Sequence, residues 1–267
     1  MLEPGPPMHR RVLRRIKSAF LQFGLTYRLY LRVKYGTDTA SLRPPAKEDL
    51  PNRVLQTHAE WRGAVREAMR LHLPLHRAEE KNWDHLAAVR AIASAKARSA
   101  RVLDAGAEFY SNVLPALFAY GFRDLYGVNL SFTAPARRGP IRYLPGDITR
   151  TEFPDSFFDA ITCMSVIEHG VHIGDYFREM FRILKPDGIL ITSTDYYPER
   201  IDTAGKVAHG APIKIFSKTE IEEMLGLAYE CGFKPTAEID LECSERPVRW
   251  NAYDLDFTFL IFTLRKP

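Results

Sequence analysis

The stretch Arg101-Val102-Leu103-Asp104-Ala105-Gly106 decides the fold, because it is an apolar strand that ends in an acidic residue, a small residue and a glycine. Five further segments follow it in order: Gly127-Val128-Asn129, Gly146-Asp147, Phe158-Asp159-Ala160-Ile161, Ile167-Glu168-His169 and Leu184-Lys185-Pro186-Asp187-Gly188. In an open α/β sheet the turns that follow parallel strands meet at one edge, where ligands bind. The sequence therefore predicts a site for a small charged cofactor between residues 101 and 194.

Strand patterns alternate with helical patterns from Arg101 onward, which favours a mostly parallel sheet with helices on both faces. The expected strands are 101–105, 124–130, 141–145, 158–165, 189–195, 234–242 and 255–265. Only about a dozen residues without a helical pattern separate the last two, which is short for a parallel crossover. The fold class is therefore α/β, with seven strands of which the last is antiparallel.

Two helices between these strands carry clear end signals. An apolar stripe from Tyr176 to Leu184 is expected to stop at Pro186. Ser217-Lys218-Thr219-Glu220 predicts a capping box at the start of a helix that Gly232 closes.

The first 36 residues are strongly basic, since they hold eight Lys or Arg and one acid, whereas the whole chain has a net charge of +4. Their apolar residues recur at helical spacing: Val12, Leu13, Ile16, Phe20, Phe23, Tyr27 and Leu31. A helix that packs this stripe on the body is favoured. A basic amphipathic helix on an anionic membrane surface and a targeting peptide stay open.

Residues 37–50, with Pro44-Pro45, are interpreted as a linker. Two further helical patterns follow, one from Val54 to Met69 and one from Leu86 to Ala93. The expected division is a basic N-terminal helical extension over residues 1–81 and an α/β domain over residues 82–267.

The composition is that of a soluble globular protein, with 46% apolar and 26% charged residues. No apolar run reaches the roughly 18 residues of a membrane-spanning helix. Three cysteines without metal-ligand spacing, and no secretory signal, favour a reducing compartment. We expect no bound metal, no nucleic-acid partner and a cytoplasmic location, with contact at the inner face of a membrane left open.

The motifs of residues 82–265 resemble the class I S-adenosylmethionine (SAM)-dependent methyltransferases, in the branch similar to the ubiquinone-biosynthesis enzymes. The resemblance implies a sheet ordered 3-2-1-4-5-7-6 and SAM lying across the carboxyl ends of the first, second and fourth strands. S-adenosylhomocysteine would be the product. The implied cofactor contacts are Asp104, Ala105, Gly106, Ala107, Glu108, Asn129, Leu130, Asp147, Ile148, Met164, Ser165 and Ile167.

Two of these positions depart from the family pattern. Glu108 stands where the first turn usually has a second glycine, and Asn129 stands where an acid usually holds the ribose hydroxyls. Glu108 would either crowd the methionine portion of SAM, point away from it, or balance its ammonium or sulfonium charge.

His169 is the candidate general base, because an imidazole titrates near neutral pH, and Glu168 is its neighbour. The alternative is that Glu168 favours a helix N-terminus and His169 orders the loop, since alignment alone can drive methyl transfer. Tyr196, Tyr197 and His209, in the insertion after the fifth strand, are expected to bind the substrate. Arg246, Arg249 and Trp250 are expected to close the same cleft.

The resemblance implies transfer of a methyl group from SAM to an O or N atom of a small-molecule, sugar or lipid-linked acceptor. The alternative is a catalytically silent methyltransferase-like protein that serves as a binding or scaffold subunit. A nicotinamide-dinucleotide enzyme is disfavoured, because the Gly-x-Gly-x-x-Gly turn is absent from the sequence.

Overall fold

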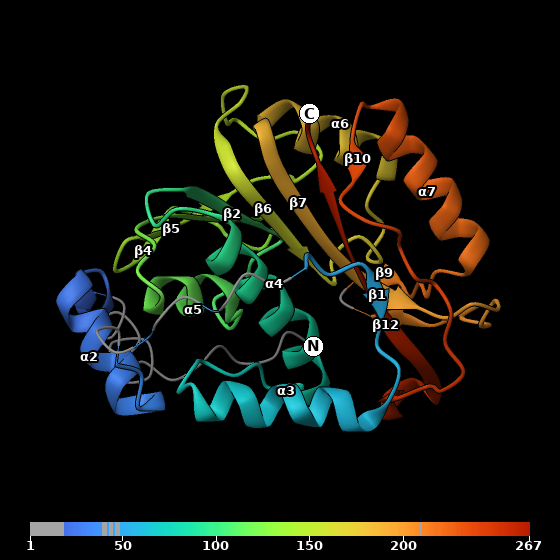
Figure 1. The fold of residues 1–267 in the computed structure, drawn as a ribbon, viewed down its shortest axis with the longest axis horizontal. Coiled ribbons are helices and arrows are strands. Elements are labelled where there is room, and N and C mark those ends of the chain that lie inside the picture. The colour runs from blue at the N-terminus through green and yellow to red at the C-terminus, as the bar shows by residue number, and fades with distance from the viewer. Residues whose placement is uncertain (1–18, 39–41, 43–44, 46–48, 209) are drawn as a thin grey trace, which may run out of the picture.

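The computed structural model describes residues 19–38, 42, 45, 49–208 and 210–267. Its core is a sheet in which β2 (Arg101–Ala105), β3 (Asp124–Asn129), β5 (Ile141–Pro145), β6 (Phe158–Met164) and β7 (Leu184–Tyr196) run parallel. The order along the sheet is β1-β12-β7-β6-β2-β3-β5-β4, and β12 (Leu255–Arg265) is antiparallel to β7. The expected α/β fold and the antiparallel last strand are confirmed (Figure 1).

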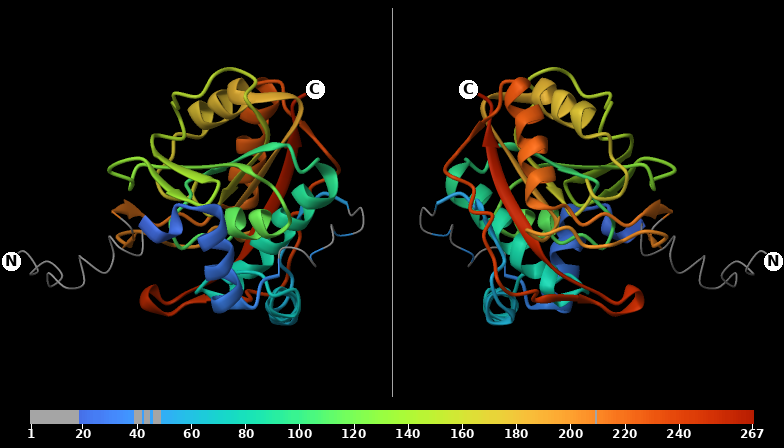
Figure 2. Two further views of the ribbon diagram at one scale, coloured as in Figure 1. Left: turned by 90° about the vertical axis from the view of Figure 1, so that its left-hand side faces the viewer. Right: turned by 90° about the vertical axis from the view of Figure 1, so that its right-hand side faces the viewer.

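The central strands β2 and β6 are buried along nearly their whole length, because both faces of the sheet are covered. Within β2, Val102 packs toward α4 (Asn82–Ala95) and α5 (Val113–Ala119), whereas Leu103 and Ala105 pack toward the opposite face. That opposite face carries α6 (Ile173–Ile183) and α7 (Lys218–Glu230) (Figures 1 and 2). α7 begins with the predicted capping box of Ser217 and Glu220, and Gly232 follows its end with a φ of +102°.

One expected strand is much shorter than predicted. The segment 234–242 forms only β10 (Lys234–Pro235), which pairs with the end of β12. Pro235 has no N–H to donate to a ladder. The remaining edge of β12 is occupied by β1 (Arg53–Val54) and by β11 (Val248–Trp250).

The N-terminal region is therefore joined to the sheet and is not helical alone. Asn52 Oδ1 accepts the N–H of Thr263 at 2.8 Å, and the Thr258 hydroxyl donates to the Leu55 carbonyl at 2.6 Å. Helix α3 (His58–Arg70), capped by Thr57, packs on α4. The boundary at residue 81 does not separate two packing units in the described part of the chain.

The predicted long N-terminal stripe is split. Val12, Leu13 and Ile16 lie outside the described residues, and α2 (Gly24–Tyr35) begins only after a bend at Gln22–Phe23. Tyr27 and Leu31 are buried against the body, whereas Phe20 and Phe23 are exposed. The bend interrupts the helix, so the predicted stripe does not run along one continuous helix.

The described residues also form five shorter elements: β4 (Ala136–Arg138), the hairpin of β8 (Val207–Ala208) with β9 (Ala211–Pro212), and the single turns η1 (Glu79–Lys81) and η2 (Asn251–Tyr253). No helix of the described residues is long and apolar enough to cross a membrane. Among these residues no group of three His, Cys, Asp or Glu is placed to hold a metal ion.

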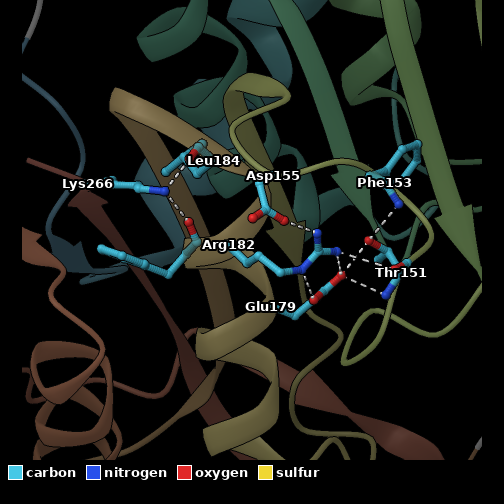
Figure 3. Close-up of polar contacts among 8 residues, drawn as sticks. Thr151, Phe153, Asp155, Glu179, Arg182, Leu184 and Lys266 are labelled. Carbon is cyan, nitrogen blue, oxygen red and sulfur yellow. Dashed lines mark hydrogen bonds and ion pairs between the residues drawn. The ribbon is translucent and has the colours of Figure 1, made fainter.

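A polar network holds the loop after β5 against α6 (Figure 3). Glu179 accepts the Thr151 N–H at 2.7 Å and bonds Arg182, which also pairs with Asp155 at 2.6 Å. Lys266 Nζ donates to the carbonyls of Phe181 and Leu184 at the end of the helix. This network fastens residues 151–155 to α6.

Candidate functional site

The carboxyl ends of the parallel strands surround two adjoining pockets. The outer pocket has a volume of about 720 Å³ and the inner pocket about 330 Å³, sizes typical of small-molecule sites. The residues that line both are Gly106, Glu108, Tyr110, Ser165, Val166 and His169. The predicted residues Asn129, Leu130, Asp147 and Ile148 line the outer pocket, and Met164 and Glu168 line the inner one.

The turn after β2 is held close to the turn after β6. Gly106 has a φ of +86°, and a Cβ at this position would overlap the Val166 side chain. Its N–H donates to the Val128 carbonyl at 2.8 Å. Glycine is therefore required here for both conformation and space.

Asn129 uses both ends of its amide within the protein. Its Nδ2 donates to the Gly106 carbonyl at 3.0 Å, and its Oδ1 accepts the Ser131 N–H at 2.8 Å. A carboxylate cannot donate, so the acid usual in the family could not make the first of these bonds. Asn129 thereby ties the first turn to the end of β3.

We expect Asn129→Asp to weaken the protein even though it restores the family's usual residue. The new carboxylate would face the Gly106 carbonyl without a proton to share, which should cost about 1–3 kcal/mol of unfolding free energy. SAM affinity should fall with it. Urea unfolding and calorimetry measure both, with the exposed Asn251→Asp as control. A variant that binds SAM more tightly and stays as stable would contradict this role.

Glu108 points to the loop after β3. Its carboxylate accepts the Ser131 hydroxyl at 2.6 Å, and its N–H donates to the Ser111 hydroxyl at 2.9 Å. Because Glu108 lines both pockets, its carboxylate lies beside the space where the resemblance puts the methionine end of SAM. Asp147 accepts the N–H and hydroxyl of Thr149 at 2.8 and 2.7 Å, which shapes the turn at the outer pocket.

Four predicted cofactor contacts do not reach either pocket: Asp104, Ala105, Ala107 and Ile167 are all buried. Asp104 pairs in register with Thr162 of β6, whose hydroxyl donates to its carboxylate at 2.8 Å. Burial raises the pKa of Asp104 to about 7. This residue lies in the core because its side chain points to the sheet face rather than to the strand end.

The raised pKa of Asp104 predicts a pH-dependent stability. The folded state holds its proton up to about pH 7, whereas the unfolded chain releases it near 3.8, so stability falls as pH rises between these values. We expect Asp104→Asn, which keeps an acceptor for Thr162, to gain up to roughly 4 kcal/mol over the wild type above pH 7. It should gain little below pH 4. Thermal denaturation across this range checks it, and a pH-independent difference would count against it.

Three charged residues of the inner pocket interact with one another: Glu168 from the turn after β6, Asp195 from β7 and Lys81 from η1. Glu168 is 1% exposed, accepts the Thr194 hydroxyl at 3.2 Å through Oε2, and leaves Oε1 without a hydrogen bond in the described structure. Burial, followed by the charge of Asp195, raises the pKa of Glu168 above its usual range. Asp195 is the penultimate residue of β7, and its Oδ1 lies 3.9 Å from Lys81 Nζ.

Lys81 balances these acids. Burial opposes its charge, but Asp195, Glu168 and Asp84 raise its pKa above the usual value. Its Nζ also lies 4.6 Å from the centre of the Phe259 ring. The inner pocket is therefore lined by a cation whose charge the neighbouring carboxylates stabilise.

Two histidines, His76 and His85, also line the inner pocket. His76 and His85 stand edge to face at 5.2 Å, and His85 Nδ1 bonds the Asn112 side chain. Burial, and then the charge of His85, lowers the pKa of His76 to about 4. Burial also lowers the pKa of His85, so both rings are neutral at pH 7.

His76, Lys81 and His85 were not predicted as site residues, because they precede the motifs that the sequence shows. One signal was present: Asp84 and His85 interrupt the apolar pattern that runs from Trp83 to Ala93. Charged residues inside such a pattern are buried only with partners, and Asp84 accepts the Ser193 hydroxyl at 2.6 Å.

The predicted substrate residues lie elsewhere. Tyr196 is fully buried and donates to the Leu241 carbonyl at 2.7 Å, and Tyr197 lies under the Arg246 guanidinium. Neither residue lines the inner or the outer pocket. For Tyr196 the reason is alternation along β7, which directs Asp195 to the pocket side and Tyr196 to the α6–α7 side. His209 lies outside the described residues. Arg249 and Trp250 do line the inner pocket, as expected, whereas Arg246 does not.

The described residues fit a bound cofactor. The Ser165 hydroxyl is buried at the junction of the two pockets without a hydrogen-bond partner there, and Ser165 holds a φ of +52°. Buried polar groups in native proteins are normally satisfied, so a ligand group is expected at this point. His169 lines both pockets, and its backbone N–H donates to the Val166 carbonyl at 3.0 Å.

Comparison with known proteins supports one class. Residues 103–192 match the methyltransferase domain family. The sterol 24-C-methyltransferase of Yarrowia lipolytica is 28% identical over 118 residues, which cover 41% of this chain and 30% of that enzyme. The chain thus spans less than a third of the length of this curated relative. Matches include both sterol and ubiquinone-biosynthesis methyltransferases, so the predicted branch is not confirmed.

Two solved structures share the fold. A geranyl diphosphate methyltransferase in complex with SAM superposes with a TM-score of 0.53 at 15% identity, over 81% of this chain and 98% of its own. The [4+2]-cyclase SpnF gives 0.52 at 16% identity, over 91% and 95%. The fold and the matched domain support the class I SAM-dependent methyltransferase superfamily, and the domain match bears out SAM as the cofactor.

Proposed function

We propose that this protein transfers the methyl group of SAM, held in the outer pocket, to an O or N atom of a small acceptor in the inner pocket. The observation that carries the proposal is the shared wall of Gly106, Ser165 and His169, at which the two pockets meet. A donor and an acceptor bound on its two sides would be brought into contact there, and such alignment is a large part of catalysis in a two-substrate reaction.

The outer pocket would hold the cofactor through the turns that follow β2, β3, β5 and β6. Gly106 lets the backbone approach the methionine portion, Asp147 and Ile148 lie on the side expected for adenine, and Glu108 offers a negative charge. Bound SAM supplies an electrophilic methyl group on a positively charged sulfur.

Glu168 can take the proton that the acceptor loses. Its Oε1 is free of other hydrogen bonds among the described residues, and its raised pKa brings a carboxylate close to the range in which a base is effective. The proton would move from the acceptor hydroxyl or ammonium to Oε1. Lys81 then stabilises the site by compensating Asp195.

The charges of the inner pocket favour neutral or cationic acceptors. Its lining contains four acids, Glu80, Glu108, Glu168 and Asp195. It contains only two Lys or Arg, and one of these, Arg249, already pairs with Asp254 and Asp256. Trp250, Phe257 and Phe259 add an apolar wall. An alcohol, phenol or amine, including one on a sugar or lipid-linked molecule, fits this lining better than a phosphorylated acceptor.

Calorimetry of the full chain with SAM and S-adenosylhomocysteine tests the cofactor site. A panel of phenols, alcohols and amines, scored by formation of S-adenosylhomocysteine, then tests the reaction. We expect saturable SAM binding, and thermal stability that rises with SAM concentration. No thermal shift at millimolar SAM would overturn the proposal in favour of the scaffold alternative, which no structural observation favours. A cytoplasmic location and the absence of a nucleic-acid partner stay predictions.

A further inference from the structure

Helix α2 presents an apolar stripe to solvent. Leu25, Leu29 and Val33 follow one another at four-residue intervals and are 80%, 53% and 79% exposed. The opposite face of α2 packs on the body of the protein, where Tyr27 and Leu31 are buried. Phe20 and Phe23, just before the helix, are also exposed. A contiguous exposed apolar surface of this kind marks an interaction site.

The charged residues of this segment are all basic. Arg28 and Arg32 stand three residues after Leu25 and Leu29 and therefore flank the stripe. Residues 19–37 contain no Asp or Glu, and the sequence has five further Lys or Arg between positions 10 and 17.

Beside α2 lies a third pocket, of about 560 Å³, which three arginines line: Arg28, Arg123 and Arg137. Phe118 also lines this pocket, with the Arg123 guanidinium 4.5 Å and the Arg28 guanidinium 5.9 Å from the centre of its ring. None of the three pairs with a carboxylate of the described residues. Figure 2 (left) views the molecule from the side on which α2 lies, and Figure 1 shows α2 beside β4 and α5.

We propose that α2 and the arginine pocket form a docking surface for an anionic lipid bilayer. Leu25, Leu29 and Val33 enter the interface between headgroups and acyl chains, while Arg28, Arg123 and Arg137 bind lipid phosphates. Basic amphipathic helices bind membranes through this combination of apolar area and positive charge. The proposal does not depend on the methyltransferase activity.

Charge argues against the other occupants. A second copy would bring the same arginine-rich, acid-free surface against this one, and the two would repel. Residues 1–18 carry five Lys or Arg and one acid, so they repel it as well. A bilayer that contains phosphatidylglycerol supplies both the negative charge and the apolar layer.

Co-sedimentation of the full chain with vesicles tests the proposal. We expect binding to phosphatidylcholine vesicles that contain phosphatidylglycerol, weakening as salt is raised, and little binding to phosphatidylcholine alone. The triple variant Leu25→Gln, Leu29→Gln and Val33→Gln should lower the partition coefficient at least tenfold, and so should Arg28→Gln with Arg137→Gln. These positions are exposed, so thermal stability and SAM binding should be unchanged.

The matched control is Leu227→Gln with Tyr229→Gln, which removes exposed apolar side chains from α7 and should leave vesicle binding intact. Equal binding by the triple variant, or equal binding to neutral and anionic vesicles, would overturn the proposal. So would a chain that binds no vesicles and forms a dimer that the triple variant dissociates.

Discussion

Glu168→Gln is expected to lower the rate of methyl transfer roughly 100-fold or more, the usual contribution of a positioned general base, while SAM affinity is unchanged. Glutamine keeps the shape of the side chain and an acceptor for Thr194, but it cannot take a proton at pH 7. Glu168 lines the inner pocket and not the outer one. The loss should therefore appear in kcat rather than in cofactor binding.

The pH profile gives this prediction a second readout. The base acts as a carboxylate, and burial together with Asp195 raises the pKa of Glu168. The wild-type rate should therefore rise with pH across the neutral range instead of levelling off near the usual carboxyl value. Glu168→Gln should lose that rise. Initial rates with the best acceptor of the panel, from pH 5 to 9, measure it.

Glu179→Gln is the matched control for Glu168, because Glu179 is also a buried carboxylate but bonds Thr151 and Arg182 away from both pockets. This change should lower stability and leave kcat nearly intact. A Glu168→Gln enzyme with wild-type kcat would show that alignment alone suffices, and His169 would then be the next candidate for the base.

Lys81→Met is expected to destabilise the protein by about 1–3 kcal/mol at pH 8 and much less at pH 5. Removing one partner of a buried ion pair leaves an uncompensated charge, here on Asp195 and Glu168. The effect is set below that of a fully buried pair, because the Lys81 side chain is 25% exposed and its Nζ is 3.9 Å from Asp195 Oδ1.

The sign of the pH dependence follows from the two acids. Burial raises the pKa of both Glu168 and Asp195, and loss of the Lys81 cation raises them further. A carboxyl whose pKa is higher in the folded state than in the unfolded chain loses stability as pH rises. The deficit of the variant should therefore grow with pH, and thermal denaturation measures it without an acceptor.

Activity adds a readout that a purely structural lysine would not move. Lys81→Met should shift the rising limb of the pH–rate profile to higher pH, because the proton on Glu168 is held more tightly. Lys96→Met is the control, since Lys96 donates to the Asp187 carbonyl and lines neither pocket. A stability deficit that is the same at pH 5 and pH 8 would contradict the electrostatic role.

Local pattern was sufficient for most of the sheet. The expected strands at 101–105, 141–145 and 255–265 match β2, β5 and β12 within their bounds, because strands covered on both faces need long apolar runs. β10 is shorter than predicted because residues 52–55 occupy part of the same edge of β12. These residues precede their partners on β12 by more than 200 positions. No local pattern records such a pairing.

The two pockets also differ in how far local sequence predicts their residues. The outer pocket is built from turns that directly follow strands, such as Gly106, Asn129, Asp147 and Ser165, so order and spacing along the chain place its residues at one edge. The inner pocket combines residues 76–85 with residues 248–259, which only the packing of η1, α4, β11 and β12 brings together.

The sequence by itself determined the fold class, the domain class and the edge of the sheet at which the two pockets lie, because periodicity and strand-end turns are local properties of the chain. The tertiary structure decided which side chains reach the ligand space. Asp104 and Tyr196 turn into the core through strand alternation, whereas Lys81 arrives from a distant segment to balance buried acids. Burial and charge pairing depend on neighbours in space, and those neighbours exist only once the chain has folded.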